Sequence, residues 1–358
     1  MSMTVSDYGS LGVLVADSQA VNQHMNTLAA QQGSGFVSNS YGGLGAASQT
    51  ALTLLPQIAH STVLQNNINV ATSQLGVTQS IMTQLQSIAT NFYQQVTSLP
   101  TEDPATVDTV ASTAQQALVE VANLLNTKDG DTYIFAGTDS TNPPVSVPTP
   151  PDTIVTQPGG FYAQINAAIS GADLSSTAGA NTALATAMSV ATSDAAGTTP
   201  FSATIGTPAM IETGVGLQTQ AGLLANQNTL IPADTSPAST GSYVRDLMLS
   251  LATLGSMSSA QGSQPGYDTL LSATQATLSE SLSGINAEAS ALGGVQGQLT
   301  GMQTLLGDTS TALTQQVSSV DDVDMAKTLS DITLTQTQLE SSYKLIASVQ
   351  KMSLTDYI

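Results

Sequence analysis

The chain has 358 residues, of which only 8% are charged, and its formal net charge is −20 at pH 7. Five lysines and arginines are too few to neutralise many phosphates, which argues against nucleic acid and anionic membrane surfaces as partners. The chain has no cysteine, which excludes a disulfide framework, a thiolate metal site and a cysteine nucleophile.

The first predicted helix carries a single narrow stripe and ends at Gly33 and Gly35. Its spacings alternate between three and four residues, which is typical of a helix that packs along one partner. The stripe consists of Leu11, Leu14, Ser18, Val21, Met25 and Leu28.

A long second helix is predicted over Gln57–Leu99, because Pro56 suits a first helical turn. At 1.5 Å per residue it would be a rod of about 64 Å. A shorter helix follows and ends near Leu125. The stripe of the long helix continues without a slip through Leu64, Ile68, Ala71, Leu75, Thr78, Met82, Leu85, Ala89, Phe92, Val96 and Leu99.

The middle of the chain, residues 131–241, differs in composition from both ends. Ten of the 14 prolines lie between Pro143 and Pro237, among many Gly, Ser and Thr. Thr132–Ala136 is typical of a strand, and Ala163–Ile169 of a short helix. We therefore expect a β-rich inserted domain, whose exposed Ser and Thr leave O-linked glycosylation open.

Helices resume near Ser242, and a second rod is predicted over Tyr267–Val317. Its apolar residues recur every seven positions, which requires a partner helix along its whole length. Six glycines inside it would cost about 6 kcal/mol relative to alanine, so either helices approach closely there or the rod depends on assembly. The heptad row is Leu271, Leu278, Ile285, Leu292, Leu299, Leu306 and Leu313, and the glycines are Gly284, Gly293, Gly294, Gly297, Gly301 and Gly307.

A last helix is predicted after a cap formed by Asp321 and Asp322. Its expected stripe is again narrow, so this helix cannot bury itself alone. The stripe consists of Met325, Leu329, Ile332, Gln336, Leu339, Tyr343 and Ile346.

The order of elements mirrors itself around the insert, which predicts that the chain folds back and that its ends meet. The expected fold is mainly α, with long antiparallel rods in a coiled-coil-like bundle. The predicted segments are an assembly helix with its loop (1–45), rod helices (46–130), the insert (131–241), rod helices (242–319) and a second assembly helix (320–358).

Two sets of residues carry this prediction. Subunit assembly is assigned to Leu14, Val21, Met25, Leu28, Leu329, Ile332, Leu339, Tyr343 and Ile346. Packing between the rods is assigned to Leu64, Leu75, Leu85, Phe92, Leu278, Ile285, Leu292, Leu299 and Leu306.

Candidate catalytic and metal-binding residues are few. His24 and His60 are the only histidines, and His24 lies on a predicted helix surface. Asp321, Asp322 and Asp324 lack the glycine of a calcium loop, and the Gly42–Gly45 stretch lacks the strand and lysine of a phosphate loop. We expect no enzyme activity, no cofactor and no metal site.

Five internal segments and the C-terminal tail share one family resemblance. The turn Gly130–Gly137 reads Gly-Asp-Thr-Tyr-Ile-Phe-Ala-Gly, and the tail Met352–Ile358 reads Met-Ser-Leu-Thr-Asp-Tyr-Ile. Together the segments resemble the flagellin superfamily, and the turn and tail are most similar to its hook–filament junction branch. The other four segments are Gln31–Gly35, Asn66–Met82, Ala287–Gly293 and Val320–Ala326.

Two segments depart from the family pattern. The family's Asp-Asp-Pro loop is Tyr41-Gly42-Gly43-Leu44 here, and expected arginines are replaced by Gln296, Gly297 and Gln298. Ion pairs that these residues make between subunits of relatives are therefore not expected in this chain.

The resemblance implies a structural subunit of the bacterial flagellum that is secreted through the flagellar type III apparatus. No basic residue precedes Lys128, so a cleaved signal peptide is not expected, and no apolar run has the length of a membrane span. The implied partners are neighbouring copies in a ring or filament, another hook-associated protein, flagellin and an export chaperone. The ends would fold on assembly.

Three alternatives stand beside the junction subunit. The first is flagellin itself, the main filament subunit. The second is a secreted coiled-coil tip or translocator protein of a virulence-type apparatus, although a translocator needs an apolar span of about 20 residues. The third is an enzyme, for which the sequence offers no catalytic arrangement.

Overall fold

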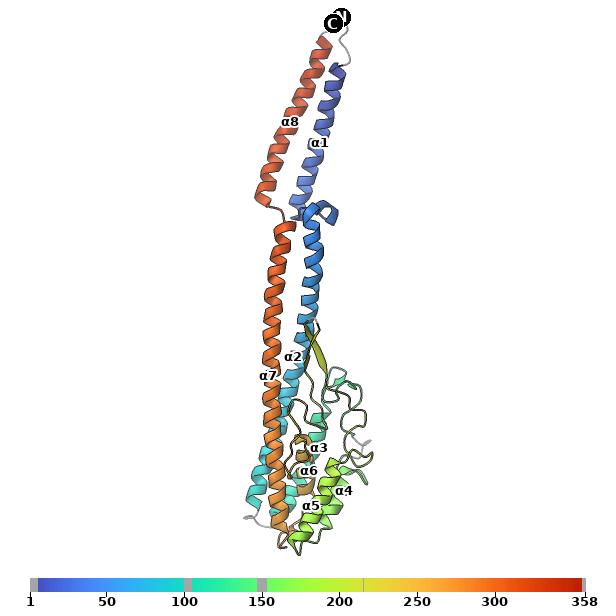
Figure 1. Cartoon of the computed structure of the whole chain (residues 1–358), viewed down its shortest axis with the longest axis vertical. Helices are drawn as coiled ribbons and strands as arrows, with labels where there is room; N and C mark the ends of the chain where they lie inside the picture. Colours follow the sequence, from blue (N-terminus) through green and yellow to red (C-terminus); the bar gives the residue numbers. More distant parts are fainter. Residues whose placement is uncertain (1–5, 100–104, 147–152, 215, 356–358) are drawn as a thin grey trace. The chain divides into compact units, whose positions relative to one another are not determined.

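A computed structural model describes residues 6–99, 105–146, 153–214 and 216–355. The chain divides into two compact units, and both are mainly helical, as predicted (Figure 1). Unit 1 joins the two chain ends, Met1–Val63 and Leu305–Ile358, and unit 2 is Leu64–Thr304. The last part of the tail motif, residues 356–358, lies outside the described residues.

The described elements follow the predicted order. The long helices are α1 (Ser6–Ser34), α2 (Ser48–Ser98), α7 (Tyr267–Asp321) and α8 (Met325–Thr355). The shorter ones are α3 (Ala105–Leu125), α4 (Phe161–Ser170), α5 (Thr177–Thr192) and α6 (Tyr243–Gly255), with 3₁₀ turns η1 (Tyr41–Ala47) and η3 (Ser259–Gln261). Two antiparallel strand pairs complete the described elements, β1 (Lys128–Asp129) with β2 (Thr132–Tyr133) and β3 (Met210–Gly214) with β4 (Leu217–Gln220).

Helix α2 begins before the predicted start. Its first residue is Ser48, so Pro56 lies inside the helix rather than in its first turn. Proline removes one backbone hydrogen bond there. Ala51 and Leu54 are both buried, and their packing stabilises the turns that precede Pro56.

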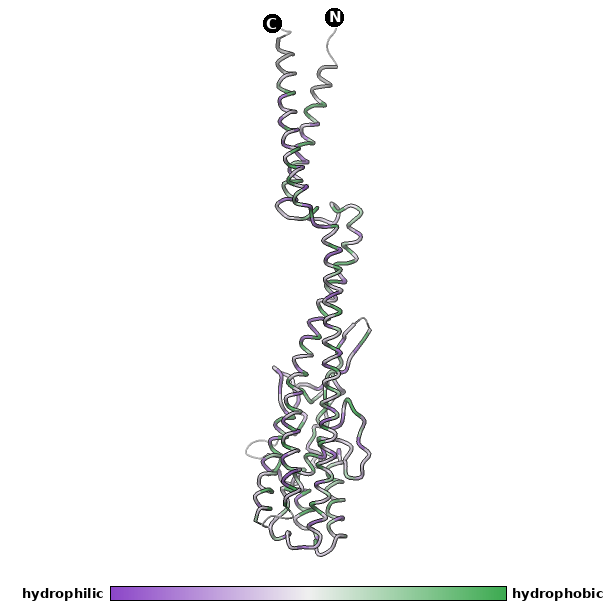
Figure 2. Tube along the Cα trace, turned by 90° about the vertical axis from the view of Figure 1, so that its left-hand side faces the viewer, coloured by the Kyte–Doolittle hydropathy of each residue, from purple (hydrophilic) through white to green (hydrophobic). Residues whose placement is uncertain are grey.

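Within unit 2, α2 and α7 lie side by side and antiparallel (Figure 1 and Figure 2). Three side-chain hydrogen bonds between the two helices define their register. The first and second bonds are 17 residues apart on each helix, from 69 to 86 on α2 and from 303 to 286 on α7. The second and third are 11 residues apart, from 86 to 97 and from 286 to 275. The register therefore contains no slip over this length. The pairs are Asn69–Gln303 at 2.5 Å, Gln86–Asn286 at 2.7 Å and Thr97–Gln275 at 2.9 Å.

The residues expected to pack the rods are buried in unit 2. Every member of the α2 stripe from Leu64 to Leu99 is buried. The α7 heptad row is buried from Leu271 to Leu299, whereas Leu306 and Leu313, which belong to unit 1, are half-buried. The heptad row is therefore buried only over its first five residues, from Leu271 to Leu299.

Helix α6 lies at the centre of unit 2, and all of its residues are buried, including Arg245. The guanidinium donates from Nε to the carbonyl oxygen of Asn226 at 2.8 Å and from Nη1 to that of Ala191 at 3.0 Å. It also pairs with the carboxylate of Asp194 and lies 5.1 Å from the ring centroid of Phe201. The single arginine of the chain therefore ties α6 to three segments of the insert.

The prediction that residues 131–241 are β-rich is wrong, because the described part of this range has more helix than strand. The described part contains helices α4 and α5, whereas its strands are short. Helix α4 includes the short predicted helix. Helix α5 is not predicted from the sequence because alanine is only weakly hydrophobic, and its buried stripe consists of Ala180, Ala183, Ala187 and Ala191.

The strand predicted over Thr132–Ala136 ends at Tyr133. Phe135 and Ala136 are instead buried in the turn that follows. Gly137 then has a φ of +65°, and a Cβ there would collide with the carbonyl oxygen of Thr207. The glycine of this motif is therefore required by both backbone conformation and close approach.

Candidate assembly surface

Helices α1 and α8 form an antiparallel pair in unit 1 (Figure 1). Backbone hydrogen bonds fix the two segments to each other at one end of the pair. The amide of Val37 donates to the carbonyl of Asp321 at 2.7 Å, and the amide of Val323 donates to that of Gly35 at 3.0 Å. The chain therefore joins its first and last helices by a short strand-like contact.

The contact face of α1 is the predicted stripe from Leu14 to Leu28. Ser18 and Leu28 are buried, and Leu14, Val21 and Met25 are half-buried. On α8 the contact face is a regular row with alternating spacings of four and three residues. It consists of Thr328, Ile332, Thr335, Leu339, Ser342 and Ile346.

The predicted stripe of α8 is therefore wrong at Met325, Leu329, Gln336 and Tyr343. The side chains of Leu329 and Tyr343 are 54% and 51% exposed, whereas Ile332 and Leu339 are each 9% exposed. Thr328 and Thr335 take the places nearest α1, because each hydroxyl is satisfied by a carbonyl of its own helix, at 2.9 and 2.7 Å. The seven-residue spacing of Thr328, Thr335 and Ser342 is the sequence signal that reveals this row.

The cap of α8 also differs from the prediction. Asp321 is the last residue of α7, and the carboxylate that caps α8 belongs to Asp324. Its Oδ1 accepts the amides of Ala326 at 3.0 Å and Lys327 at 3.1 Å. A capping role for this acidic run is confirmed, although the capping residue is two to three positions later.

Large apolar side chains stand exposed beside the contact row of α8. At about 100° per residue, Met325, Leu329 and Tyr343 lie on one side of that row, and Leu334 and Leu345 lie on the other. Each of the five is about half exposed. Helix α1 shows the same arrangement, with the exposed Val13 and Val15 on either side of Leu14.

A hollow of about 380 Å³ adjoins Tyr343 at the junction with α1. The lining from α1 is mostly polar and includes Gln19, Asn22 and Gln23. The phenol ring of Tyr343 is therefore available to a neighbouring molecule beside groups that can form hydrogen bonds.

The pair is weakly stabilised within the isolated chain. Isolated helices gain most of their stability from packing of an apolar face, and here that face includes three hydroxyl residues on α8. Covering a fully exposed side chain of the size of Leu or Val is worth about 1.5–3 kcal/mol. Covering the exposed apolar residues of this helix pair at an interface would therefore contribute a large favourable free energy to association.

Charge is unevenly divided between the two helices. Three of the five basic residues, Lys327, Lys344 and Lys351, belong to α8, whereas the charged residues of α1 are Asp7 and Asp17. Lys327 and Lys344 are exposed and form no ion pair within the described part of the chain. Helix α8 also carries Asp331 and Glu340, so it presents charges of both signs, whereas α1 carries only negative ones.

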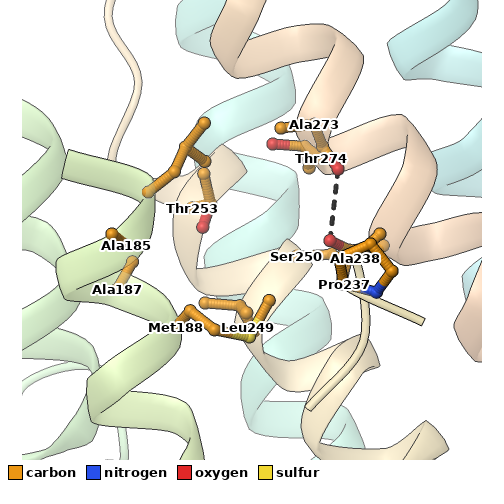
Figure 3. Close-up of a pocket in the computed structure, with 12 residues that line it drawn as sticks. Ala185, Ala187, Met188, Pro237, Ala238, Leu249, Ser250, Thr253, Ala273 and Thr274 are labelled. Carbon is orange, nitrogen blue, oxygen red and sulfur yellow. Dashed lines mark hydrogen bonds between the residues drawn. The ribbon is translucent and has the colours of Figure 1, made fainter. Parts of the chain in front are cut away.

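One pocket of unit 2 is lined by apolar and hydroxyl side chains. This pocket of about 540 Å³ lies among α5, α6 and α7, and Figure 3 shows Met188, Leu249 and Thr253 around it. The described residues that line it include no charged side chain. The hydroxyls of Ser250 and Thr274 donate to carbonyls of their own helices, so the pocket presents no activated nucleophile.

Carboxylates of α6 and α7 hold residues 226–241, which we call the strap. Glu288 is fully buried, and its carboxylate accepts the amides of Thr229 and Leu230 at 2.9 Å and of Ile231 at 3.2 Å. Burial raises the pKa of Glu288, and the three amide donors lower it by less. The carboxyl group of Glu288 therefore satisfies three backbone amides of the strap.

Two further carboxylates act in the same way. Asp246 accepts the hydroxyl of Ser239 and the amide of Thr240, both at 2.6 Å, and Glu280 accepts the hydroxyl of Ser236 at 2.8 Å. Burial raises the pKa of Asp246 to about 6, against the lowering effect of its hydrogen bonds. These groups position the strap and have no histidine or metal partner in the described structure.

Asp246→Asn is expected to raise stability at pH 7 and to flatten its pH dependence. Because the folded-state pKa of about 6 exceeds the usual 3.8, the native protein binds a proton between these values that the unfolded chain does not. Wild-type stability therefore rises as pH falls from 7 towards 4, by up to about 3 kcal/mol from this group. Urea unfolding of both proteins at pH 7 and pH 4.5 measures the difference. A constant difference at the two pH values would contradict the assignment.

The candidate metal and catalytic residues do not converge. His24 and His60 are both exposed on helix surfaces. Among the residues that the structure describes, no group of three or more His, Asp or Glu side chains is placed to hold a metal ion. Within the same residues, no helix is both long and apolar enough to cross a membrane.

Comparison with known families identifies the C-terminal helices. Residues 275–358 match the bacterial flagellin C-terminal helical region, which covers most of α7 and all of α8. No curated protein matches the chain. The match covers 84 of the 358 residues, so the likeness to flagellin is found in the C-terminal helices.

Proposed function

We propose that this chain is a secreted structural subunit of the bacterial flagellum and that it assembles through the α1–α8 pair. The observation that carries the proposal is the set of exposed apolar residues on either side of the contact row, at the helices that match flagellin. A monomeric protein gains nothing from exposing them, whereas a subunit with neighbours on both sides buries them.

The arrangement suits neighbouring copies of the same chain. Two apolar flanks on one helix pair allow each copy to contact one neighbour on each side, which is the geometry of a ring or an open helical assembly. The exposed Lys327 and Lys344 of α8 can pair with carboxylates of a neighbouring copy, including Asp17 of α1. The missing Asp-Asp-Pro loop and arginines imply that apolar contact contributes more here than in relatives.

Within the flagellum, we assign the chain to the junction between hook and filament. The turn Gly130–Gly137 and the tail after Lys351 support this choice, because both resemble the third hook-associated protein. Its partners would be another hook-associated protein, flagellin and an export chaperone. The second candidate is flagellin itself, which the match to the flagellin C-terminal region favours.

Immunogold labelling of isolated flagella separates the two functions. A junction subunit is expected to label only the end of the hook, and its deletion should leave hooks without filaments and flagellin in the medium. Label along the whole filament, together with growth of long filaments from the purified protein, would identify flagellin. Absence of label from flagella would overturn both assignments.

A further inference from the structure

Burial along α7 changes abruptly after Leu292. Ten of the 26 residues from Tyr267 to Leu292 are buried, whereas Leu299 is the one buried residue among the 24 from Gly293 to Gln316. The first part contacts several elements of unit 2, including the strap through Glu288 and α6 through Ser281. After Leu292 the helix is held by far fewer side chains.

Glycines are concentrated at the start of this sparsely buried part. A Cβ added at any of four of them would meet no atom within 4 Å, so packing within the chain does not require glycine there. Gly284 is different, because a Cβ at that position would approach the Cβ of Tyr243 to 2.7 Å. The four unexplained glycines are Gly293, Gly294, Gly297 and Gly301.

The opposite helix has the same feature at the same level. The register that pairs Gln86 with Asn286 places Gly76, ten residues earlier, opposite position 296. A Cβ at Gly76 would also meet nothing within 4 Å. The α2 stripe at this level includes the small Ala71 and the polar Thr78, although Ile68 and Leu75 are fully buried there.

The energetic consequence is a weak stretch of paired helix. Each glycine inside a helix costs about 1 kcal/mol relative to alanine. Local opening in proteins is easiest where few apolar side chains are buried and backbone hydrogen bonds are exposed. Both conditions are met on α7 after Leu292, while the hydrogen bond between Asn69 and Gln303 shows that α7 remains paired with α2 in the native state.

We propose that residues 293–304 of α7 form a compliant segment, which opens locally far more readily than the preceding part of α7. The glycines act by lowering the local cost of leaving the helical conformation. For a subunit that must fit into an assembly, such a segment allows a change of backbone geometry without unfolding of the core of unit 2.

Hydrogen exchange of the full-length monomer tests the compliant segment directly. We expect amides in 293–304 to exchange at least about 10-fold faster than those in 270–290. A variant with all four glycines changed to alanine should slow exchange in 293–304 by about 10²–10³-fold, because each 1.4 kcal/mol is a factor of ten. The control is Gly12→Ala in α1, which also meets open space and should leave this segment unchanged.

Two results would overturn the proposal. One is wild-type exchange in 293–304 as slow as in 270–290, and the other is an unchanged rate in the four-alanine variant. The role in assembly rests on the proposed function and has its own readout. Cells that export the four-alanine variant normally are expected to swim poorly, and normal swimming despite slowed exchange would refute that role. Absence of the wild-type protein from labelled flagella, in contrast, would refute the proposed function and leave the compliant segment untouched.

Discussion

The double substitution Leu329→Asp with Tyr343→Asp is expected to abolish assembly and to leave the isolated chain folded. Both side chains are more than half exposed, so the new carboxylates remain hydrated in the monomer. At a subunit interface each would become a buried, unpaired charge, at a cost of several kcal/mol per site. Two such sites per copy would reduce association beyond detection.

Sedimentation of the purified protein under polymerising conditions, or recovery of the subunit in isolated flagella, measures the assembly. Thermal unfolding of the monomer should shift by no more than about 1 °C, since exposed substitutions usually change stability by less than about 0.5 kcal/mol. The matched control is Ser330→Asp with Thr337→Asp, which adds the same charge at exposed positions of α8 that face away from α1. Equal loss of assembly in both variants would point to net charge rather than to the apolar flank.

Arg245→Ala is expected to lower the free energy of unfolding of unit 2 by about 3–5 kcal/mol. The substitution leaves the carbonyls of Asn226 and Ala191 without their donor, at about 1–3 kcal/mol for each buried group. It also removes the contact with the ring of Phe201. Arg245→Lys should be intermediate, because a single ammonium group cannot reproduce the planar fork that reaches both carbonyls.

The comparison with Asp194→Ala identifies the source of this effect. The side chain of Asp194 is 81% exposed, so its ion pair with the buried arginine is expected to contribute less than about 1 kcal/mol. Guanidinium chloride unfolding followed by tyrosine fluorescence and far-ultraviolet circular dichroism provides the measurement. If Asp194→Ala were as damaging as Arg245→Ala, the ion pair rather than the carbonyl contacts would hold the insert.

Sequence reasoning succeeds where a residue's chemistry and its spacing agree. The α2 stripe from Leu64 to Leu99 is large and apolar at almost every position, and the structure buries all of it. The α1 stripe is also predicted in the correct rotation, because Leu14, Val21, Met25 and Leu28 follow one another at spacings of three, four and seven residues along one face. Such patterns can be predicted because a helix with one narrow apolar stripe has one low-energy way to face a partner.

It fails where small or polar residues occupy buried positions. Helix α5 packs through alanines, and α8 faces α1 through threonines whose hydroxyls are satisfied within their own helix. Arg245 and Glu288 are the strongest examples, since charged residues are rarely buried and their partners are backbone groups. Backbone donors and acceptors carry no signature in the sequence, so neither contact could be anticipated.

The order of the long helices, their apolar periods and the fold-back that brings the chain ends together could be read from the sequence alone. Those properties depend on local spacing and on the composition of each segment, which are complete in the linear chain. Only the tertiary structure decided the register of α2 against α7, the rotation of α8 that leaves Leu329 and Tyr343 exposed, and the open surroundings of the glycines after Leu292. These properties depend on which atoms meet across long separations in sequence, and many similar hydrophobic stripes can satisfy the same period in more than one rotation or register.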